Sequence, residues 1–291
     1  MERVGSPVRL RRWHSRQTAS ASGAGSVCYG ERFRFCSSRY ADPFGLISGY
    51  AEQVNVPKMT ASPTGIVLAA GRGYRLAPVT DKCPKPLLEV GGYPLIEYQI
   101  RHLAMMGVRD LVVVVGHLGA QIEDYVRARF EAVFRHIDVA TQEVLGMSEY
   151  ALAIGTERAK SDTIICLCGD DLLPVGALSS LVECFTQDVA AVFVALPVES
   201  AKVSRVQLSA SGQVTGPGSI LDPIITYNFT CRRDFIMKWC ATTQGEQPLV
   251  DFVLSNHAQY GMQCFAIDID IITINNMADL QQARHLADSF K

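Results

Sequence analysis

The chain has 291 residues, of which 48% are hydrophobic and 19% charged, and its formal net charge is −2. This length suits one large domain or two small ones, the near-neutral charge gives no indication of a nucleic-acid partner, and no apolar run reaches the length of a membrane span. The nine cysteines are scattered, and Cys166 and Cys168 lack the two-residue gap of a zinc or redox motif. They indicate reduced intracellular thiols.

Residues 1–58 differ in composition from the rest of the chain. They hold nine basic residues against four acidic ones, which gives +5 and leaves −7 for the remainder of the −2 chain. The segment is rich in serine and lacks clear periodicity, as in an organelle transit peptide. A disordered tail or an upstream extension is the alternative, with Met59 as a natural start. We therefore expect a folded domain over 59–291, in the cytoplasm, or in an organelle if the extension is a transit peptide.

The stretch from Gly65 to Gly92 predicts a phosphate-handling loop. The apolar run 66–69 is short enough for a buried strand, and it is followed at once by Gly71 and Gly73. Glycine permits the backbone angles and the close approach that a phosphate group needs. Two cations follow, Arg75 and Lys85, and the prolines on both sides of Lys85 stiffen its backbone.

Strands and helices alternate over the first two thirds of the domain. The apolar and β-branched runs predict strands at 66–69, 111–115, 137–140, 163–167 and 190–196. Amphipathic patterns between them predict helices at 94–106, 121–130, 150–159 and 175–185. This rhythm predicts an α/β fold with a Rossmann-like, open and mostly parallel sheet that has helices on both faces.

The pattern changes after residue 200, where we expect a small antiparallel insertion rather than a second domain. The segments 203–208 and 213–215 predict a hairpin, and Gly216-Pro217-Gly218 predicts a break after it. The remaining elements are expected as strands at 224–230 and 264–269 and helices at 233–241, 249–259 and 279–289.

A pair of acids follows the predicted strand 163–167. Asp170 and Asp171 should lie at the same sheet edge as the glycine loop, because ligands of open parallel sheets bind beyond the carboxyl ends of the strands. Carboxylates there can hold a magnesium ion that bridges phosphate oxygens. The alternative is a capping role ahead of the helix at 175.

The glycine stretch also carries a family resemblance. It reads Leu-Ala-Ala-Gly-x-Gly-x-Arg-Leu-x-Pro-x-Thr from Leu68 and Pro-Lys-Pro-Leu-Leu-Glu-Val-Gly-Gly from Pro84. This pattern resembles the nucleotidyltransferase superfamily, which includes sugar-1-phosphate nucleotidyltransferases and phosphocholine cytidylyltransferases. The resemblance implies catalytic roles for Arg75, at the leaving pyrophosphate, and for Lys85, at the α-phosphate or the acceptor's phosphate. It also implies Asp170 as the magnesium ligand, with Asp171 as the second candidate.

The same resemblance implies a nucleotide-binding set, namely Leu68, Ala69, Ala70, Gly71, Gly73 and Gln142. Gln142 stands where the family reads the edge of the nucleobase. The following residues depart from the family, because Met147 falls where its glycine stands and Gly146 is one place early.

The acceptor side departs further from the family pattern. Sugar nucleotidyltransferases usually carry Glu-Lys-Pro after the hairpin, whereas this chain has Gly216-Pro217-Gly218. Thr273 stands where a second metal-binding residue is often found, and Asp268, Asp270 and Asn275 are the alternatives. Asp279 is expected to cap the last helix.

These observations predict a magnesium-dependent nucleotidyltransferase that joins a nucleoside monophosphate from an NTP to a phosphorylated small acceptor. A sugar 1-phosphate is the expected acceptor, and phosphocholine is the alternative. A nucleotide-binding paralogue without efficient catalysis also stays open, as does assembly into a homo-oligomer. A dinucleotide-binding oxidoreductase is disfavoured because Leu76 replaces the third glycine of its fingerprint.

Overall fold

The computed structural model describes residues 62–143, 146–173, 175–186, 188–196, 204–220, 222–243, 247–266 and 271–286. All of these residues belong to one compact unit, Asp42–Lys291. Residues 1–58 lie outside the described residues, so the boundary at Met59 stays a prediction.

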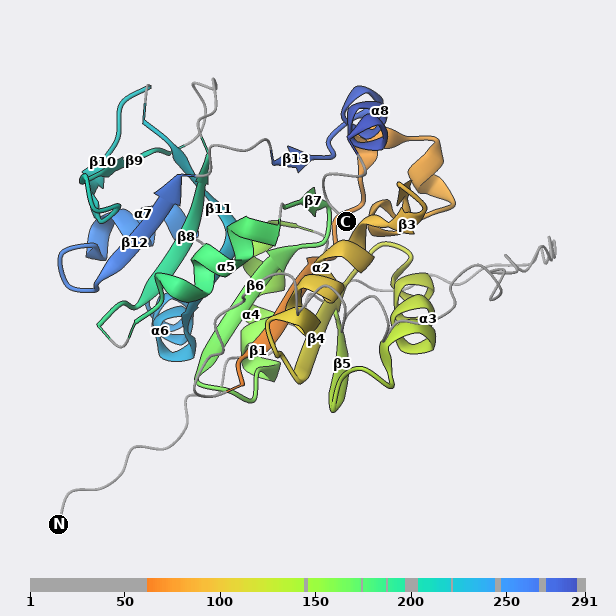
Figure 1. Ribbon diagram of the computed structural model, residues 1–291, viewed down its shortest axis with the longest axis horizontal. Helices are drawn as coiled ribbons and strands as arrows, with labels where there is room; N and C mark the ends of the chain where they lie inside the picture. The colour runs from red at the N-terminus through yellow and green to blue at the C-terminus, as the bar shows by residue number, and fades with distance from the viewer. Residues whose placement is uncertain are drawn as a thin grey trace, which may run out of the picture. The chain divides into compact units, whose positions relative to one another are not determined.

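A seven-stranded sheet forms the centre of the fold (Figure 1), in the order β12-β8-β11-β6-β1-β4-β5. The strands are β1 (Thr64–Ala69), β4 (Asp110–Val115), β5 (His136–Thr141), β6 (Thr163–Cys168), β8 (Ala191–Leu196), β11 (Ile224–Arg232) and β12 (Met262–Ala266). Strand β11 is antiparallel to both neighbours, and every other pairing in this sheet is parallel. The predicted α/β, mostly parallel sheet with an antiparallel insertion is therefore confirmed.

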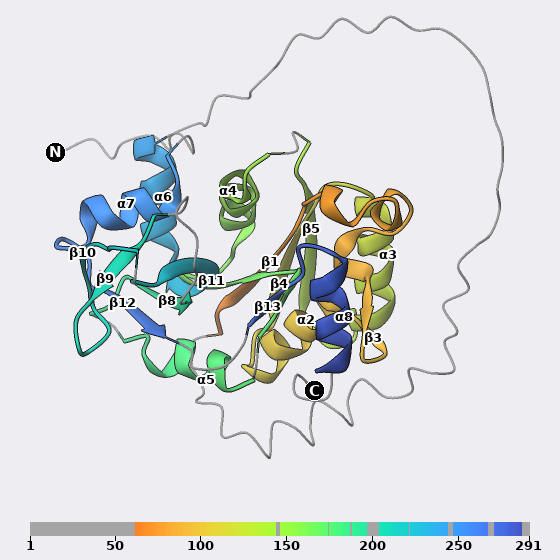
Figure 2. The same cartoon turned by 90° about the horizontal axis from the view of Figure 1, so that it is seen from above.

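Helices cover both faces of the sheet (Figure 2). They are α2 (Leu95–Met105), α3 (Gly119–Phe130), α4 (Ser148–Arg158), α5 (Val175–Glu183), α6 (Arg233–Thr243) and α7 (Leu249–Asn256). Val67 of β1 packs in a core with α2, α3 and α5, whereas its neighbour Ile66 packs in a second core with α4, α6 and α7. Since successive side chains of a strand point to opposite faces, every residue of β1 is buried.

Short paired segments lie beyond the main sheet. They are β2 (Glu89–Val90) with β3 (Tyr93–Pro94), β7 (Asp171–Leu172) with β13 (Ile272–Thr273), and β9 (Val206–Leu208) with β10 (Val214–Pro217). The predicted break at Gly216-Pro217-Gly218 is wrong for its first two residues, which belong to β10. A register shift between Val214 and Gly216 accommodates them, because a two-stranded edge tolerates glycine and proline where a central strand does not.

The last elements differ in their bounds from those expected. Strand β12 begins at Met262, two residues before the predicted start, and residues 267–270 lie outside the described part of the chain. Helix α8 (Met277–His285) begins with Asn276 as its N-cap, and the side chain of Asp279 completes a capping box. The expected capping role of Asp279 is therefore confirmed.

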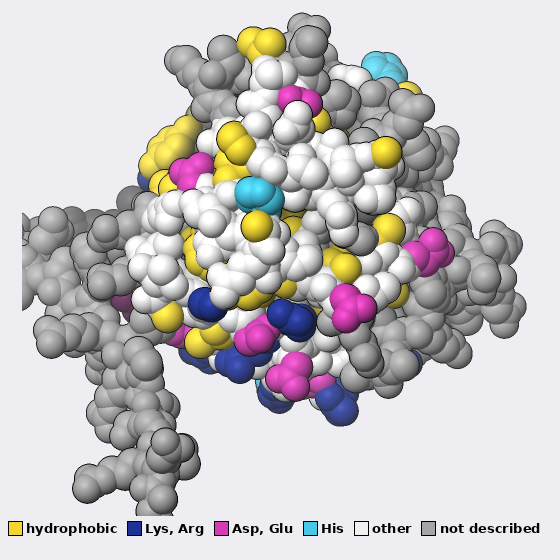
Figure 3. Space-filling view, turned by 90° about the vertical axis from the view of Figure 1, so that its left-hand side faces the viewer, with side chains coloured by type: hydrophobic (Ala, Val, Ile, Leu, Met, Phe, Trp, Pro, Cys, Tyr) yellow, Lys and Arg dark blue, Asp and Glu magenta, His cyan; other side chains and the backbone are white. Residues whose placement is uncertain are grey.

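The face around β9, β10 and α7 carries charges of both signs (Figure 3). Lys and Arg side chains lie beside Asp and Glu, and hydrophobic side chains are interspersed between polar ones. Among the described residues seen on this face, neither sign dominates, so it lacks the extended basic surface that attracts a phosphate backbone. Within the described ranges, none of the helices combines the length and the apolar character that crossing a membrane requires.

His102 of α2 makes the stability of the fold depend on pH. Its side chain is buried and, within the described ranges, its Nδ1 lacks a hydrogen-bond partner. Burial, followed by the charge of Arg101, lowers the pKa of His102 from 6.5 to about 4. Between these values the unfolded chain binds a proton that the folded chain excludes, so stability falls as the pH falls.

We therefore expect the free energy of unfolding to drop by about 2–3 kcal/mol through His102 between pH 7 and pH 4.5. The variant His102→Gln should lose this part of the pH dependence in urea denaturation curves measured at both pH values. His136→Gln, at an exposed position at the start of β5, is the matched control and should follow the wild type. Parallel losses of stability in His102→Gln and wild type would contradict the assignment.

Candidate active site

The loops after β1 and β6 meet at the carboxyl edge of the sheet. The two strands pair in parallel, with Leu68 opposite Cys168, and the Gly169 N–H donates to the Leu68 carbonyl over 2.9 Å. A Cβ added at Gly169 would lie 3.1 Å from that same oxygen. Glycine at this position therefore lets the loop that carries Asp170 approach the first strand closely.

A pocket lies over this edge, and its free space of about 520 Å³ includes the open solvent at its mouth. The residues selected from the sequence that line it are Leu68, Ala69, Ala70, Gly71, Lys85, Gln142 and Asp170. The start of α4 and the residues before it form another part of the wall, including Met147 and Ser148. Gly73, Arg75 and Asp171 do not line the pocket.

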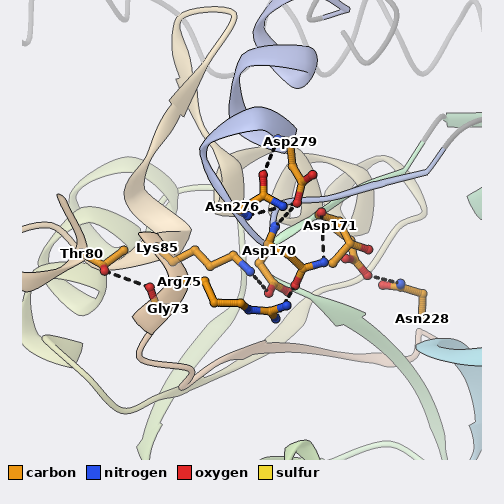
Figure 4. Close-up of polar contacts among 11 residues, drawn as sticks. Gly73, Arg75, Thr80, Lys85, Asp170, Asp171, Asn228, Asn276 and Asp279 are labelled. Carbon is orange, nitrogen blue, oxygen red and sulfur yellow. Dashed lines mark hydrogen bonds and ion pairs between the residues drawn. The ribbon is translucent and has the colours of Figure 1, made fainter. Parts of the chain in front are cut away.

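The two glycines of the glycine loop, Gly71 and Gly73, differ in their surroundings. Gly73 has φ +70°, in the left-handed region, and an added Cβ would lie 3.1 Å from Thr80 Cγ2 and 3.2 Å from Lys85 Cβ. The Thr80 hydroxyl donates to the Gly73 carbonyl over 3.0 Å (Figure 4). Gly71 lines the pocket, and an added Cβ there would meet nothing within 4 Å. Gly73 thus shapes the loop, while Gly71 leaves open space for a ligand.

Lys85 and Asp170 form an ion pair at the pocket (Figure 4). The Lys85 Nζ lies 2.5 Å from Asp170 Oδ2, and the two side chains are 9% and 35% exposed. Lys85 begins a short 3₁₀ helix, Lys85–Leu87, which Pro84 precedes in extended conformation. The stiff backbone keeps the buried lysine stem in place, so the cation and the carboxylate balance each other's charge beside the pocket.

Arg75 reaches the last part of the chain. Its guanidinium donates to Asn275 Oδ1 over 2.7 Å, across 200 positions of sequence. Asn275, one of the residues considered for a second metal ligand, therefore contacts the arginine of the signature loop. The other two, Asp268 and Asp270, lie outside the described residues.

Asp171 is turned away from the pocket that Asp170 lines. It is buried in β7, where its carboxylate accepts hydrogen bonds from Asn228 Nδ2, over 2.7 Å, and from the Thr273 side chain. Burial, followed by the charge of Asp170, raises the pKa of Asp171 from 3.8 to about 6. The two neighbouring acids thus have different surroundings, and the accessible one is Asp170.

One polar residue of β11 near this site, Asn228, was missed by the sequence analysis. Asn228 is fully buried, and its Oδ1 accepts from the Cys168 N–H over 2.9 Å. The Tyr227 hydroxyl donates to Glu149, which lies in the first turn of α4. The available signal was the amide of Asn228 among the β-branched and aromatic residues of the strand pattern 224–230, which a buried strand admits only where the amide finds partners.

The carboxylate at the pocket fits a magnesium ion that is bound partly by phosphate groups of a ligand. Among the described residues, no three His, Cys, Asp or Glu side chains are grouped to hold a metal ion. Magnesium often binds through one or two carboxylates together with substrate phosphates and water. The partly exposed Asp170 carboxylate beside the glycine loop fits that arrangement.

Comparison with known proteins gives matches along the part of the chain that builds the pocket. Residues 64–204 match the family model "Nucleotidyl transferase". A choline-phosphate cytidylyltransferase of Streptococcus pneumoniae is 46% identical over 65 residues, which cover 22% of this chain and 28% of that protein. A glucose-1-phosphate cytidylyltransferase of Salmonella typhimurium is 27% identical over 129 residues, which cover 44% of this chain and 48% of that protein. The chain thus spans less than half the length of either curated relative.

Solved structures extend the likeness to the fold as a whole. The inositol-1-phosphate CTP transferase of T. maritima superimposes with a TM-score of 0.65, over 79% of this chain and 97% of that chain, at 21% sequence identity. At this identity the likeness establishes the shared fold.

The contrast between the loop glycines gives a test of the loop geometry. Gly73→Ala should lower the free energy of unfolding by about 1–2 kcal/mol, because a side chain at a left-handed backbone position is strained and its Cβ would press on Thr80 and Lys85. Gly71→Ala is the matched control and should stay within about 0.5 kcal/mol of the wild type. Denaturant unfolding of the three proteins measures this, and equal stability of both variants would contradict the geometry.

Proposed function

Since this chain belongs to the nucleotidyltransferase superfamily, we propose that it transfers a nucleoside monophosphate from an NTP to a phosphorylated small acceptor. Pyrophosphate is the second product. The observation that carries the proposal is the gathering of the glycine loop, Lys85, Gln142 and Asp170 around one pocket. A base-reading amide, a phosphate-binding loop, a cation and a carboxylate are the groups that this reaction requires.

The proposed chemistry needs no nucleophilic side chain. A phosphate oxygen of the acceptor attacks the α-phosphorus of the NTP in line, a new P–O bond forms, and the bond to the leaving pyrophosphate breaks. Negative charge then builds on the non-bridging and leaving oxygens, where fixed cations stabilise it. In this proposal Lys85 serves the α-phosphate or the acceptor's phosphate, and Arg75 serves the leaving pyrophosphate.

We propose that Asp170 holds a magnesium ion together with the phosphates of the NTP. The bound ion supplies charge neutralisation and orients the phosphate oxygens. Lys85 Nζ lies 2.5 Å from Asp170 Oδ2. In this proposal Lys85 Nζ exchanges the carboxylate for a phosphate oxygen when NTP binds, which a flexible four-carbon side chain can do without a change of the backbone.

A sugar 1-phosphate is the acceptor we propose, and phosphocholine is the alternative. Both classes are represented among the relatives, for example by the glucose-1-phosphate enzyme of S. typhimurium and the choline-phosphate enzyme of S. pneumoniae. Gly216 and Pro217 in β10 provide no cation for the phosphate of a sugar. This departure is the observation that supports the alternative, in which Lys85 alone would serve the acceptor's phosphate.

A nucleotide-binding paralogue without efficient transfer is a second candidate function. Its specific support is Thr273, which stands where a metal-binding residue is often found and instead bonds to Asp171. Such a protein would bind NTP and release no pyrophosphate.

The first test crosses the four NTPs with phosphorylated sugars and phosphocholine, using the full chain and magnesium. We expect pyrophosphate release that depends on one NTP and one acceptor, since the pocket combines a base-reading side with a phosphate side. Omitting magnesium or the acceptor provides the controls. NTP binding without release across the whole panel would reject the transferase and support the paralogue.

The variant Arg75→Ala tests the charge-stabilising role of the signature arginine. We expect kcat to fall about 10²- to 10³-fold, equivalent to about 3–4 kcal/mol of transition-state stabilisation. The control is Arg158→Ala, at the end of α4, whose exposed side chain pairs with Asp138. If Arg75→Ala turns over as fast as the control, Arg75 does not stabilise the transition state.

A further inference from the structure

Asn228 connects the two ends of the turn that carries Asp170. Its Oδ1 accepts from the N–H of Cys168, the last residue of β6, and its Nδ2 donates to Oδ2 of Asp171, the first residue of β7. Asp170 and Gly169 lie between these two contacts. The amide of Asn228 is therefore a bridge across a single short turn, and Figure 4 shows its contact with Asp171.

The orientation of this amide follows from its partners. The Cys168 N–H is a donor and requires the amide oxygen, so the NH₂ group is left to face the Asp171 carboxylate. Asn228 is fully buried and Asp171 nearly so. A hydrogen bond to a buried carboxylate is strong, and removing its donor leaves the charge uncompensated.

The backbone of β11 changes register where it presents Asn228. Its pairing with β8 shifts between Ile225 and Phe229, and its described pairing with β6 begins at Phe229 opposite Cys166. A break in register of this kind re-aims a side chain, and such breaks are frequent beside active sites.

Other contacts hold the same turn from its remaining sides. The Gly169 N–H bonds to Leu68 of β1, and the Ile274 N–H donates to the Asp170 carbonyl over 3.2 Å. The backbone of Asp170 is thereby fixed, while its carboxylate lines the pocket. Asn228 is the side chain that ties this turn to β11.

We propose that Asn228 is a positioning residue that sets the place of the Asp170 carboxylate for a divalent cation and NTP. Asp171 takes part as the buried partner of Asn228, and it does not ligate the metal. The inference rests on the proposed function, because it assigns Asp170 to the metal.

The test is an exchange of the two bridging side chains. Asn228→Asp keeps an oxygen for the Cys168 N–H but places two carboxylates together, and Asp171→Asn leaves one acceptor oxygen where the Asn228 NH₂ and the Thr273 hydroxyl both donate. In the double variant, the amide introduced at position 171 would donate to the carboxylate introduced at position 228 and would accept from Thr273. Every bond of the bridge is then restored with an unchanged total charge.

The measured quantity is the Kd for Mn²⁺ in the presence of NTP, which electron paramagnetic resonance determines on the full chain. We expect each single variant to raise the Kd for Mn²⁺ about tenfold, which corresponds to about 1.4 kcal/mol, and the double variant to return to within about threefold of the wild type. Binding of NTP without metal should be unchanged. Asn256→Asp is the control, since the same chemical change removes a bond from Asn256 to Phe252 on α7, outside the site.

A double variant that binds Mn²⁺ no better than the single variants would overturn the proposal, since that is the result expected if Asp171 itself ligates the metal. Should one single variant not fold, the other single variant and the double variant still decide the question. Unchanged Mn²⁺ affinity in a folded single variant also overturns it. A wild type that binds Mn²⁺ and NTP but releases no pyrophosphate rejects the proposed transferase alone.

Discussion

The parallel pairing of β1 with both β4 and β6 is the constraint on which the site depends. It places the ends of two strands that are about a hundred positions apart at one edge, where Leu68 lies opposite Cys168. The face of β1 that carries Ile66 packs closely on α4, where a Cβ added at Gly155 would lie 2.7 Å from the Ile66 side chain. Close packing of the sheet thus fixes the origin of both loops, and the chemistry is carried by the residues that follow.

Each charged residue of the site has a partner within the protein. Lys85 pairs with Asp170, the exposed Arg75 bonds to Asn275, and Asp171 accepts hydrogen bonds from Asn228 and Thr273. For Lys85, Asp170 and Asp171, which are buried or partly buried, such partners offset the cost of removing a charge from water. The partners differ in accessibility, because the Lys85–Asp170 pair faces the pocket and the Asp171 cluster faces the interior. Of these two groups, the Lys85–Asp170 pair is the one that a molecule in the pocket could contact.

The features that could be predicted from the sequence are those that depend on residues close together in the chain. Buried strands, amphipathic helices, the glycine loop, Lys85 and Asp170 all follow from residues that are neighbours in the chain. The contacts of Asn228 and Thr273 with Asp171 could not be predicted, because they join positions 57 or more apart and because β7 and β13 have two residues each, too few to show periodicity. The break expected at Gly216 was wrong because a two-stranded edge tolerates residues that interrupt a central strand.

The contact between Arg75 and Asn275 also has a consequence for how the chain is made. Synthesis proceeds from the N-terminus, so the signature loop leaves the ribosome about 200 residues before its partner does. The strand partner of β7, Ile272–Thr273, arrives equally late. Until then the arginine loop and the Asp171 carboxylate lack these bonds, and contacts of such long sequence separation form slowly. The growing chain can build most of its central sheet before the Arg75–Asn275 hydrogen bond and the pairing of β7 with β13 have formed.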